Sequence, residues 1–352
     1  MIIVSPELAG PRLKGFDMFA GAGGFTLAAA REGVDVILAV NHWPLAIDVH
    51  EANNPGTEHR REDLCRFDFA GVDPFDVLVA GASCQPHSRA GQVGRAHSSK
   101  VADDHEQMRA TMWAIEKCLR LCLPPVAVIE NVPDIDRWVD LARWLRAIER
   151  LGYVVTQQDL VASFFGVPQR RVRRFFICVL GGPAVTVENP DVPEVGVDTI
   201  FDPTASGWID IERMRRTKSK RGHLTAREKA RHANRRLGGA LGWGMHVNHR
   251  AAWGRPASEP INTITTKAGQ LWWVHDGRYR LWTDLERRRG VGFPDDYNLL
   301  GANKTLTAKL LGNAVPPAMA AAVIRAATAH LRRSAPPRRR SRVRQLELGG
   351  LN

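Results

Sequence analysis

The chain has 352 residues, a length that suits two domains or one large domain with an insert. Lys and Arg together number 49 against 37 Asp and Glu, and the formal charge of +12 favours a polyanionic partner, nucleic acid before a membrane surface. There is no run of about 18 apolar residues to predict a membrane span, and residues 1–10 lack the charged and then apolar layout of a signal peptide.

The first half of the chain alternates between predicted strands and predicted helices. Residues 15–19 predict a short strand that ends in a Gly-rich turn, followed by a helix over 25–32 and a strand over 34–40. Further strands are predicted over 75–80, 126–129 and 175–180, and further helices over 108–121 and 138–151. The continuous apolar character of the strand at 75–80 fits a parallel sheet covered on both faces. The alternation predicts a doubly wound α/β domain.

The composition changes after residue 183. Residues 184 to about 275 show weak periodicity, many Trp and dense charge, and the stretch 213–236 contains eleven Lys or Arg against one acid. We therefore expect a first domain over 1–183, a smaller domain over 184–278, a return to the first domain over 279–331 that ends in a helix, and a basic, disordered tail over 332–352. The core of the smaller domain is predicted to contain Trp208, Trp243, Trp253, Trp272 and Trp273.

A thiol and a carboxylic acid follow two neighbouring predicted strands. Cys84 lies in Gly81-Ala82-Ser83-Cys84-Gln85-Pro86, and Glu130 begins Glu130-Asn131-Val132 less than fifty residues later. Covalent activation of a pyrimidine ring needs a nucleophile and an acid placed in this way. A lone Cys in a Gly-containing turn is more typically a small buried apolar residue, so the interpretation depends on the motifs around it.

Taken in chain order, those motifs resemble the DNA cytosine-5 methyltransferases, from about residue 13 to 330. The matching segments are Asp17 to Gly24, Asn41-His42-Trp43, Asp63-Leu64, Gly81 to Gln85, Glu130-Asn131-Val132, Gln169-Arg170-Arg171-Val172-Arg173, Arg255 to Thr266, Gly292 to Tyr297 and Gly312 to Pro317. The resemblance implies a Rossmann-like, S-adenosylmethionine-dependent methyltransferase domain with a smaller target-recognition domain. It also implies S-adenosyl-L-methionine as the cofactor.

The resemblance assigns roles to individual residues. Cys84 would be the nucleophile and Glu130 the acid, while Arg171 and Arg173 would share one strand face, lower the pKa of the thiol and orient Glu130. The cofactor-binding residues would be Phe19, Ala20, Gly21, Ala22, Gly23, Gly24, His42, Trp43, Asp63, Leu64, Asn313 and Val315.

Three of these residues would contact defined parts of the cofactor. Trp43 would stack on the adenine, Asp63 would accept a hydrogen bond from its amine, and His42 would hold the ribose hydroxyls. The chain departs from the family at two positions. His42 stands in place of an acid, and Ser83 stands in place of the proline that precedes the nucleophile.

The target of such an enzyme is a cytosine flipped out of a DNA duplex. The loop over 86–107 is expected to take part in flipping, and the basic stretch of the smaller domain is expected to bind phosphates. The predicted DNA-binding residues are Gln85, Ser88, Arg89, Arg95, Lys100, Arg213, Arg215, Arg216, Lys218, Lys220 and Arg221.

The sequence leaves three other functions open. The same chemistry on tRNA fits the basic charge, although the long insert before Arg255 favours duplex DNA with sequence readout. A non-catalytic DNA-binding homologue is supported by Ser83 and His42 and opposed by Cys84 and Glu130. An unrelated nucleotide-binding oxidoreductase would explain only the Gly-rich turn.

We also expect a monomer that acts on double-stranded DNA in the cytoplasm and is bacterial or phage-encoded. A separately encoded restriction endonuclease is a candidate partner, and no contact with a membrane is expected. The five cysteines include no Cys-x-x-Cys pair. This pattern fits a reducing compartment and predicts no structural metal.

Overall fold

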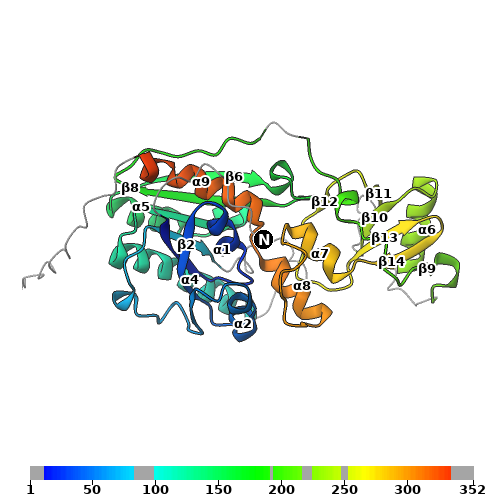
Figure 1. Cartoon of the computed structure of the whole chain (residues 1–352), viewed down its shortest axis with the longest axis horizontal. Coiled ribbons are helices and arrows are strands. Elements are labelled where there is room, and N and C mark those ends of the chain that lie inside the picture. Colours follow the sequence, from blue (N-terminus) through cyan, green and yellow to red (C-terminus); the bar gives the residue numbers. More distant parts are fainter. Residues whose placement is uncertain (1–11, 83–98, 191–192, 216–223, 247–252, 334–352) are drawn as a thin grey trace, which may run out of the picture.

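The computed structural model describes residues 12–82, 99–190, 193–215, 224–246 and 253–333. Figure 1 shows two bodies of different size, a larger one built on the N-terminal strands and a smaller one built on strands from the second half of the chain. The expected disordered tail lies outside the described residues, apart from its first two positions, which end a helix.

Within the described residues, a sheet of seven strands forms the centre of the larger body, in the order β3-β2-β1-β4-β5-β8-β6. The strands are β1 (Leu13–Met18), β2 (Val34–Val40), β3 (Glu58–Arg60), β4 (Val77–Gly81), β5 (Val126–Asn131), β6 (Tyr153–Val161) and β8 (Val172–Leu180). The first five in this order pair in parallel, and β8 runs antiparallel to both β5 and β6. The predicted α/β fold is confirmed, while the antiparallel edge is an addition that the apolar pattern did not indicate.

Helices cover both faces of this sheet, as the continuous apolar strands predict (Figure 1). Helices α1 (Gly24–Arg31) and α9 (Pro317–Arg333) pack on one face against residues such as Val77 and Val79. Helices α4 (Ser99–Cys122) and α5 (Leu141–Arg150) pack on the other face against the alternate residues Leu78 and Ala80. Helix α2 (Pro44–Asn53) follows β2.

The smaller body contains a five-stranded antiparallel sheet in the order β11-β10-β13-β14-β9. Its elements are β9 (Ile209–Asp210), β10 (Gly242–Met245), β11 (Trp253–Pro256), β13 (Leu271–His275), β14 (Arg278–Leu281) and α6 (Ala226–Leu237). Trp243, Trp272 and Trp273 are at most 2% exposed, which confirms the predicted core role of these three. Gly244 is needed beside them, because a Cβ atom there would lie 2.1 Å from the ring of Trp272.

Two helices and a two-stranded pairing connect the bodies. Strand β12 (Ile261–Asn262) pairs in parallel with β7 (Gln169–Arg170), and α7 (Asp284–Val291) and α8 (Lys304–Asn313) lie between the two larger sheets in Figure 1. The described residues also form short 3₁₀ helices: η1 (Phe69–Gly71), η2 (Pro133–Arg137), η3 (Ala162–Phe165), η4 (Val197–Ile200) and η5 (Ile211–Arg213).

One segment of the described chain, Lys304–Arg332, contains a window that is apolar enough to cross a membrane, and 72% of this window is buried within the fold. The segment is not one continuous helix, since α8 ends at Asn313 and α9 begins at Pro317. The apolar residues of α9 pack against α1 and the sheet. This burial and packing are those of a helix in the core of the fold.

Candidate functional site

The Gly-rich turn between β1 and α1 adopts a backbone that favours glycine. Gly21 and Gly23 have φ values of 53° and 82°, and Phe19 also lies in the left-handed region at 61°. Gly24 is packed so closely that a Cβ atom would lie 2.3 Å from the carbonyl oxygen of Val315. Within the part of the chain that the structure describes, no side chain caps the N-terminus of α1 at Gly23. The turn therefore presents a helix N-terminus to a ligand and brings it against Val315, as the predicted cofactor site requires.

A tyrosine from the last third of the chain holds this turn in place. Tyr297 is 6% exposed, and its hydroxyl donates a 2.5 Å hydrogen bond to the carbonyl of Ala22. A Cβ atom on Gly23 would lie 2.5 Å from the same hydroxyl and 3.2 Å from the ring of His50. Tyr297 ends one of the sequence motifs, but the sequence alone assigned it no role. In the sequence, only its position after Gly292-Phe293-Pro294 pointed to a role for Tyr297.

The end of β2 carries the predicted adenine-binding and ribose-binding residues. The amide of Trp43 donates to Asn41 Oδ1 at 2.9 Å, and Pro44 begins α2 immediately afterwards. Trp43 is half-buried, and His42 is exposed. Both side chains are thus accessible at the sheet edge where the Gly-rich turn also lies.

The remaining predicted cofactor residues differ in their accessibility. Asp63 is exposed, and its Oδ1 accepts a 3.0 Å hydrogen bond from the amide of Cys65. Leu64 is 2% exposed and packs in the core beneath the sheet. Asn313 is exposed at the end of α8, whereas Val315 is buried beside Gly24.

Strands β4 and β5 bring the cofactor turn and the predicted acid together. Gly81 pairs with Glu130 in the parallel register of these strands. A Cβ atom on Gly81 would lie 3.6 Å from Val315 Cγ2, 3.9 Å from Glu130 Oε2 and 3.9 Å from the ring of Phe25. The chain enters the predicted nucleophile motif at this point, although Cys84 itself lies outside the described residues.

Glu130 and Arg173 form a buried ion pair. Arg173 Nε lies 2.6 Å from Glu130 Oε1, and the two residues are only 7% and 5% exposed. Arg173 Nη1 also donates to the carbonyl of Val172 at 2.7 Å. The guanidinium on strand β8 is fixed by its bond to Val172, so the ion pair holds the Glu130 carboxylate in one orientation.

Arg171 lies on the same buried face but reaches different partners. Its Nη1 donates to the carbonyl of Ile264 at 3.1 Å and its Nη2 to the carbonyl of Gly312 at 3.0 Å. Gln169 adds a bond from its Nε2 to the carbonyl of Gly290 at 2.8 Å. These two side chains of the Gln-x-Arg-x-Arg motif thus tie together segments that lie about a hundred residues further along the chain.

A buried polar chain runs beneath the Gly-rich turn. Thr26 Oγ1 donates to Asp17 Oδ2 at 2.8 Å, His50 Nε2 lies 2.9 Å from the same hydroxyl, and His50 Nδ1 lies 2.7 Å from His59 Nε2. With Asp17 ionised, the hydroxyl proton of Thr26 points to the carboxylate, so His50 Nε2 donates to Thr26 and His59 Nε2 donates to His50. Burial raises the pKa of Asp17 to about 7 and lowers the pKa of His50 to about 3.

The predicted DNA-binding residues are only partly described. Arg213 and Arg215 are exposed, and Lys100 lies in the first turn of α4. The others lie outside the described residues, namely Gln85, Ser88, Arg89, Arg95, Arg216, Lys218, Lys220 and Arg221.

Several cations of the basic stretch 213–236 serve the fold of the smaller body itself. Arg227 and Arg231 both form ion pairs with Glu212, and Lys229 is 6% exposed. These side chains are therefore less available to phosphates than the cation count of the sequence indicates.

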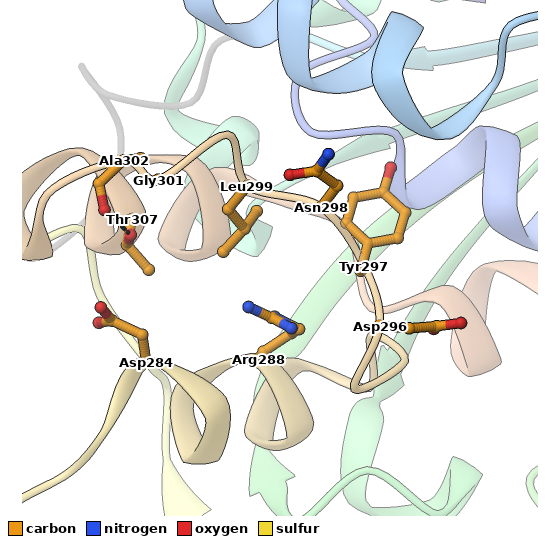
Figure 2. A pocket seen from close by; sticks show the side chains of 9 residues that line it. All are labelled: Asp284, Arg288, Asp296, Tyr297, Asn298, Leu299, Gly301, Ala302 and Thr307. Atoms are coloured by element: carbon orange, nitrogen blue, oxygen red, sulfur yellow. Dashed lines mark hydrogen bonds between the residues drawn. The ribbon is translucent and has the colours of Figure 1, made fainter.

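A separate polar pocket of about 440 Å³ lies between α7 and α8 (Figure 2). Its lining consists of Asp284, Arg288, Asp296, Tyr297, Asn298, Leu299, Gly301, Ala302 and Thr307. Among the described residues, none of those predicted for catalysis or cofactor binding lines it. Figure 2 shows the hydroxyl of Tyr297 directed away from the cavity, in agreement with its bond to Ala22.

Comparisons with known proteins agree with this arrangement. Residues 13–329 match the family model described as C-5 cytosine-specific DNA methylase. The Type II methyltransferase M.PspPI of Psychrobacter sp. strain TA137 is 27% identical over 337 residues, which cover 87% of this chain and 77% of that protein. The Type II methyltransferase M1.HphI of Haemophilus parahaemolyticus is 32% identical over 187 residues, so this alignment spans about half of either protein, 51% and 49%.

The fold also resembles that of a solved structure. A DNA modification methyltransferase encoded within a prophage of E. coli superposes with a TM-score of 0.64 at 21% identity, covering 92% of this chain and 100% of that chain. At this identity the likeness concerns the fold alone.

Proposed function

The chain belongs to the C-5 cytosine-specific DNA methylase family, and we propose that it transfers the methyl group of S-adenosyl-L-methionine to carbon 5 of a flipped-out cytosine in a specific duplex DNA sequence. The observation that carries this proposal is the pairing of Gly81 with Glu130, together with the buried ion pair between Glu130 and Arg173. These contacts support the assignment of Glu130 as an acid with a fixed orientation. It lies beside the end of β4, from which the chain continues to Cys84.

The residues around the Gly-rich turn fit this cofactor. The N-terminus of α1 has no side-chain cap, and its amides and dipole suit the cofactor carboxylate. Trp43 offers a half-buried ring to the adenine, exposed Asp63 can accept from its amine, and exposed His42 can hydrogen-bond the ribose. Asn313 and Val315 would close the pocket from the C-terminal side. When bound, the cofactor supplies an electrophilic methyl group on a sulfonium.

The chemistry then divides between Cys84 and Glu130. Addition of the Cys84 thiolate to carbon 6 makes carbon 5 nucleophilic, and Glu130 donates a proton or a strong hydrogen bond to ring nitrogen 3 as the thiolate adds. Carbon 5 would then take the methyl group, which releases S-adenosylhomocysteine. Loss of the carbon 5 proton to solvent would expel Cys84 as a thiolate while nitrogen 3 returns its proton to Glu130, and the product is 5-methylcytosine. Arg173 holds Glu130 for this task, and Arg171 holds the surrounding segments together.

Sequence recognition is proposed for the smaller domain, residues 184–278. Flipping the base costs a few kcal/mol, which phosphate contacts from Arg213, Arg215 and the loop after Cys84 would help to offset. The segment 279–331 returns to complete the catalytic domain. We further propose a monomeric, cytoplasmic enzyme of bacterial or phage origin, able to work beside a separately encoded endonuclease.

The test is transfer of a labelled methyl group to duplex DNA and to tRNA, followed by single-base mapping of 5-methylcytosine. The proposal predicts methylation of DNA within one sequence and none of tRNA. Methylation of tRNA alone would redirect the assignment to RNA. A protein that binds DNA and cofactor without transfer would be a non-catalytic homologue.

A further inference from the structure

Lys309 of α8 lies over the ring of Trp43, with its Nζ 4.4 Å from the ring centroid. Lys309 is exposed, and Trp43 is half-buried at the start of α2. We propose that Lys309 is a positioning residue for the cofactor: its ammonium holds one face of the indole, so that the other face is ready to stack on adenine. This inference rests on the proposed function, from which it takes the stacking role of Trp43.

The backbone of Trp43 is fixed, but its side chain needs a further contact. The amide of Trp43 is bonded to Asn41 Oδ1, and Pro44 fixes the following turn. One side of the indole packs against the adjacent core cluster. Lys309 adds a contact on the exposed part of the ring and so restricts the side-chain torsions of Trp43 further. A preoriented ring costs less entropy when a ligand stacks on it.

The ammonium of Lys309 is committed to this ring. Among the described residues, no carboxylate lies within ion-pair distance of Lys309, and the Trp43 ring is its recorded partner. Some of the other cations over rings have a second anchor. Lys117, above the ring of Phe69, also donates to the carbonyl of Phe67 at 3.0 Å. The attraction between an ammonium and the face of an indole is therefore what places Lys309.

The position of Lys309 on α8 connects it to the rest of the cofactor site. Lys309 and Asn313 are four residues apart on this helix, so they lie on the same face one turn from each other. The chain then continues to Val315, which contacts the Gly-rich turn at Gly24. One short segment thus delivers Lys309 to the adenine end of the proposed pocket and Val315 to the turn.

The experiment measures the affinity for S-adenosylhomocysteine by isothermal titration calorimetry. Lys309→Met keeps the length of the side chain and removes its charge, whereas Lys309→Arg keeps the charge. A cation–π contact at an exposed site corresponds to about a two- to five-fold change in affinity. We expect Lys309→Met to bind two- to five-fold more weakly at low salt and Lys309→Arg to bind like the wild type. The difference should shrink in about 1 M salt, where screening is strong.

Two controls separate this role from a general effect of charge. Lys304→Met removes an exposed lysine from the first turn of the same helix and should leave the affinity unchanged. In a Trp43→Leu background, Lys309→Met should have no further effect, because the ring that it positions is absent. Thermal unfolding of each variant confirms that the fold is retained.

The outcomes distinguish this inference from the proposed function. Equal binding by the wild type and Lys309→Met would overturn the inference alone. Tighter binding by Lys309→Met would also overturn it, since Lys309 would then occupy the face that adenine needs. If Lys309→Met weakened cofactor binding as much in the Trp43→Leu background as in the wild type, Lys309 would act through a residue other than Trp43. Absence of binding to the wild type would overturn the proposed cofactor, and this inference with it.

Discussion

Tyr297 donates a hydrogen bond to the carbonyl of Ala22 across 275 residues of sequence, at a distance of 2.5 Å. The bond links the loop after α7 to the turn that opens α1. A second link runs alongside it, in which Asn53 Nδ2 donates to the carbonyl of Asn298 at 2.8 Å and the amide of Asn298 donates back to Asn53 Oδ1 at 2.8 Å. The shape of the Gly-rich turn therefore depends on a segment from the far end of the chain.

Tyr297→Phe should weaken cofactor binding about five-fold while leaving the affinity for DNA unchanged. The substitution removes one hydrogen bond, worth about 1 kcal/mol, and leaves the carbonyl of Ala22 without this donor. Titration of S-adenosylhomocysteine into the variant measures the effect.

Tyr279→Phe provides a matched control in the smaller body. The hydroxyl of Tyr279 lies 2.8 Å from His246 Nε2, and the residue is 7% exposed. Its loss should lower the free energy of unfolding by a similar amount without any change in cofactor affinity. Equal weakening of cofactor binding by both substitutions would contradict a specific role for Tyr297.

Glu130→Gln should reduce the rate of methyl transfer by about 10² or more, within the usual range for general acid catalysis. The amide keeps the shape of the Glu130 side chain, so the affinities for DNA and cofactor should change little. Single-turnover rates with saturating DNA measure the chemical step directly. A near-normal rate in a folded variant would show that another group protonates the ring.

Asp17→Asn should become more stable relative to the wild type as the pH rises from about 4 to 7. Burial raises the folded-state pKa of Asp17 to about 7, so the folded protein holds a proton that the unfolded chain releases near pH 3.8. Stability from this group is present below the unfolded pKa and is lost as the pH rises through the folded value, by up to about 1.4 kcal/mol per pH unit.

His50 has the opposite dependence, which makes the comparison with the wild type necessary. Its pKa is lowered to about 3, so its contribution to stability is lost as the pH falls from 6.5. Between pH 4 and 6.5, Asp17 and His50 change the free energy of unfolding of the wild type in opposite directions as the pH varies. The effect of Asp17 is therefore isolated by the difference in this free energy between the wild type and Asp17→Asn. Urea unfolding at several pH values measures that difference. A difference that does not vary with pH would contradict the ionisation assigned to Asp17.

His42→Ala should weaken cofactor binding by roughly 1 kcal/mol, the size of one hydrogen bond, with little loss of the saturated rate. His42 is exposed beside Trp43, so its removal should not disturb the fold. Calorimetry with S-adenosylhomocysteine and the rate at saturating cofactor separate the two effects. Unchanged affinity would mean that His42 faces solvent when the cofactor is bound.

Much of the larger domain could be predicted from the sequence, because buried parallel strands leave continuous apolar runs. The predicted strand over 34–40 coincides with β2, and the predicted helix over 25–32 differs from α1 by one residue at each end. Strand β6 was not predicted, since it lies at the sheet edge and alternates exposed polar residues such as Gln157 and Asp159 with half-buried or buried ones. Its antiparallel direction depends on tertiary pairing that periodicity does not reveal.

The candidate site also has a part that could be predicted from the sequence and a part that could not. Glu130 and Arg173 were identified from motifs, since a short local pattern carries them. The bonds from Arg171 to Ile264 and Gly312 join positions 93 and 141 residues apart, and no local pattern indicates them. The buried chain from Asp17 to His59 was also missed, because polar residues that pair only after folding look like ordinary surface residues in the sequence.

Covalent catalysis by Cys84 is tested most directly by trapping the protein on a duplex with 5-fluorocytosine at the mapped target. Fluorine cannot leave carbon 5 as a proton does, so addition of the thiolate followed by methyl transfer should stall as a stable protein–DNA adduct. We expect an adduct at Cys84 with the wild type and with Cys65→Ala, and none with Cys84→Ala, which should still bind S-adenosylhomocysteine. An adduct with Cys84→Ala, or none with a wild type that methylates ordinary DNA, would contradict covalent catalysis by Cys84.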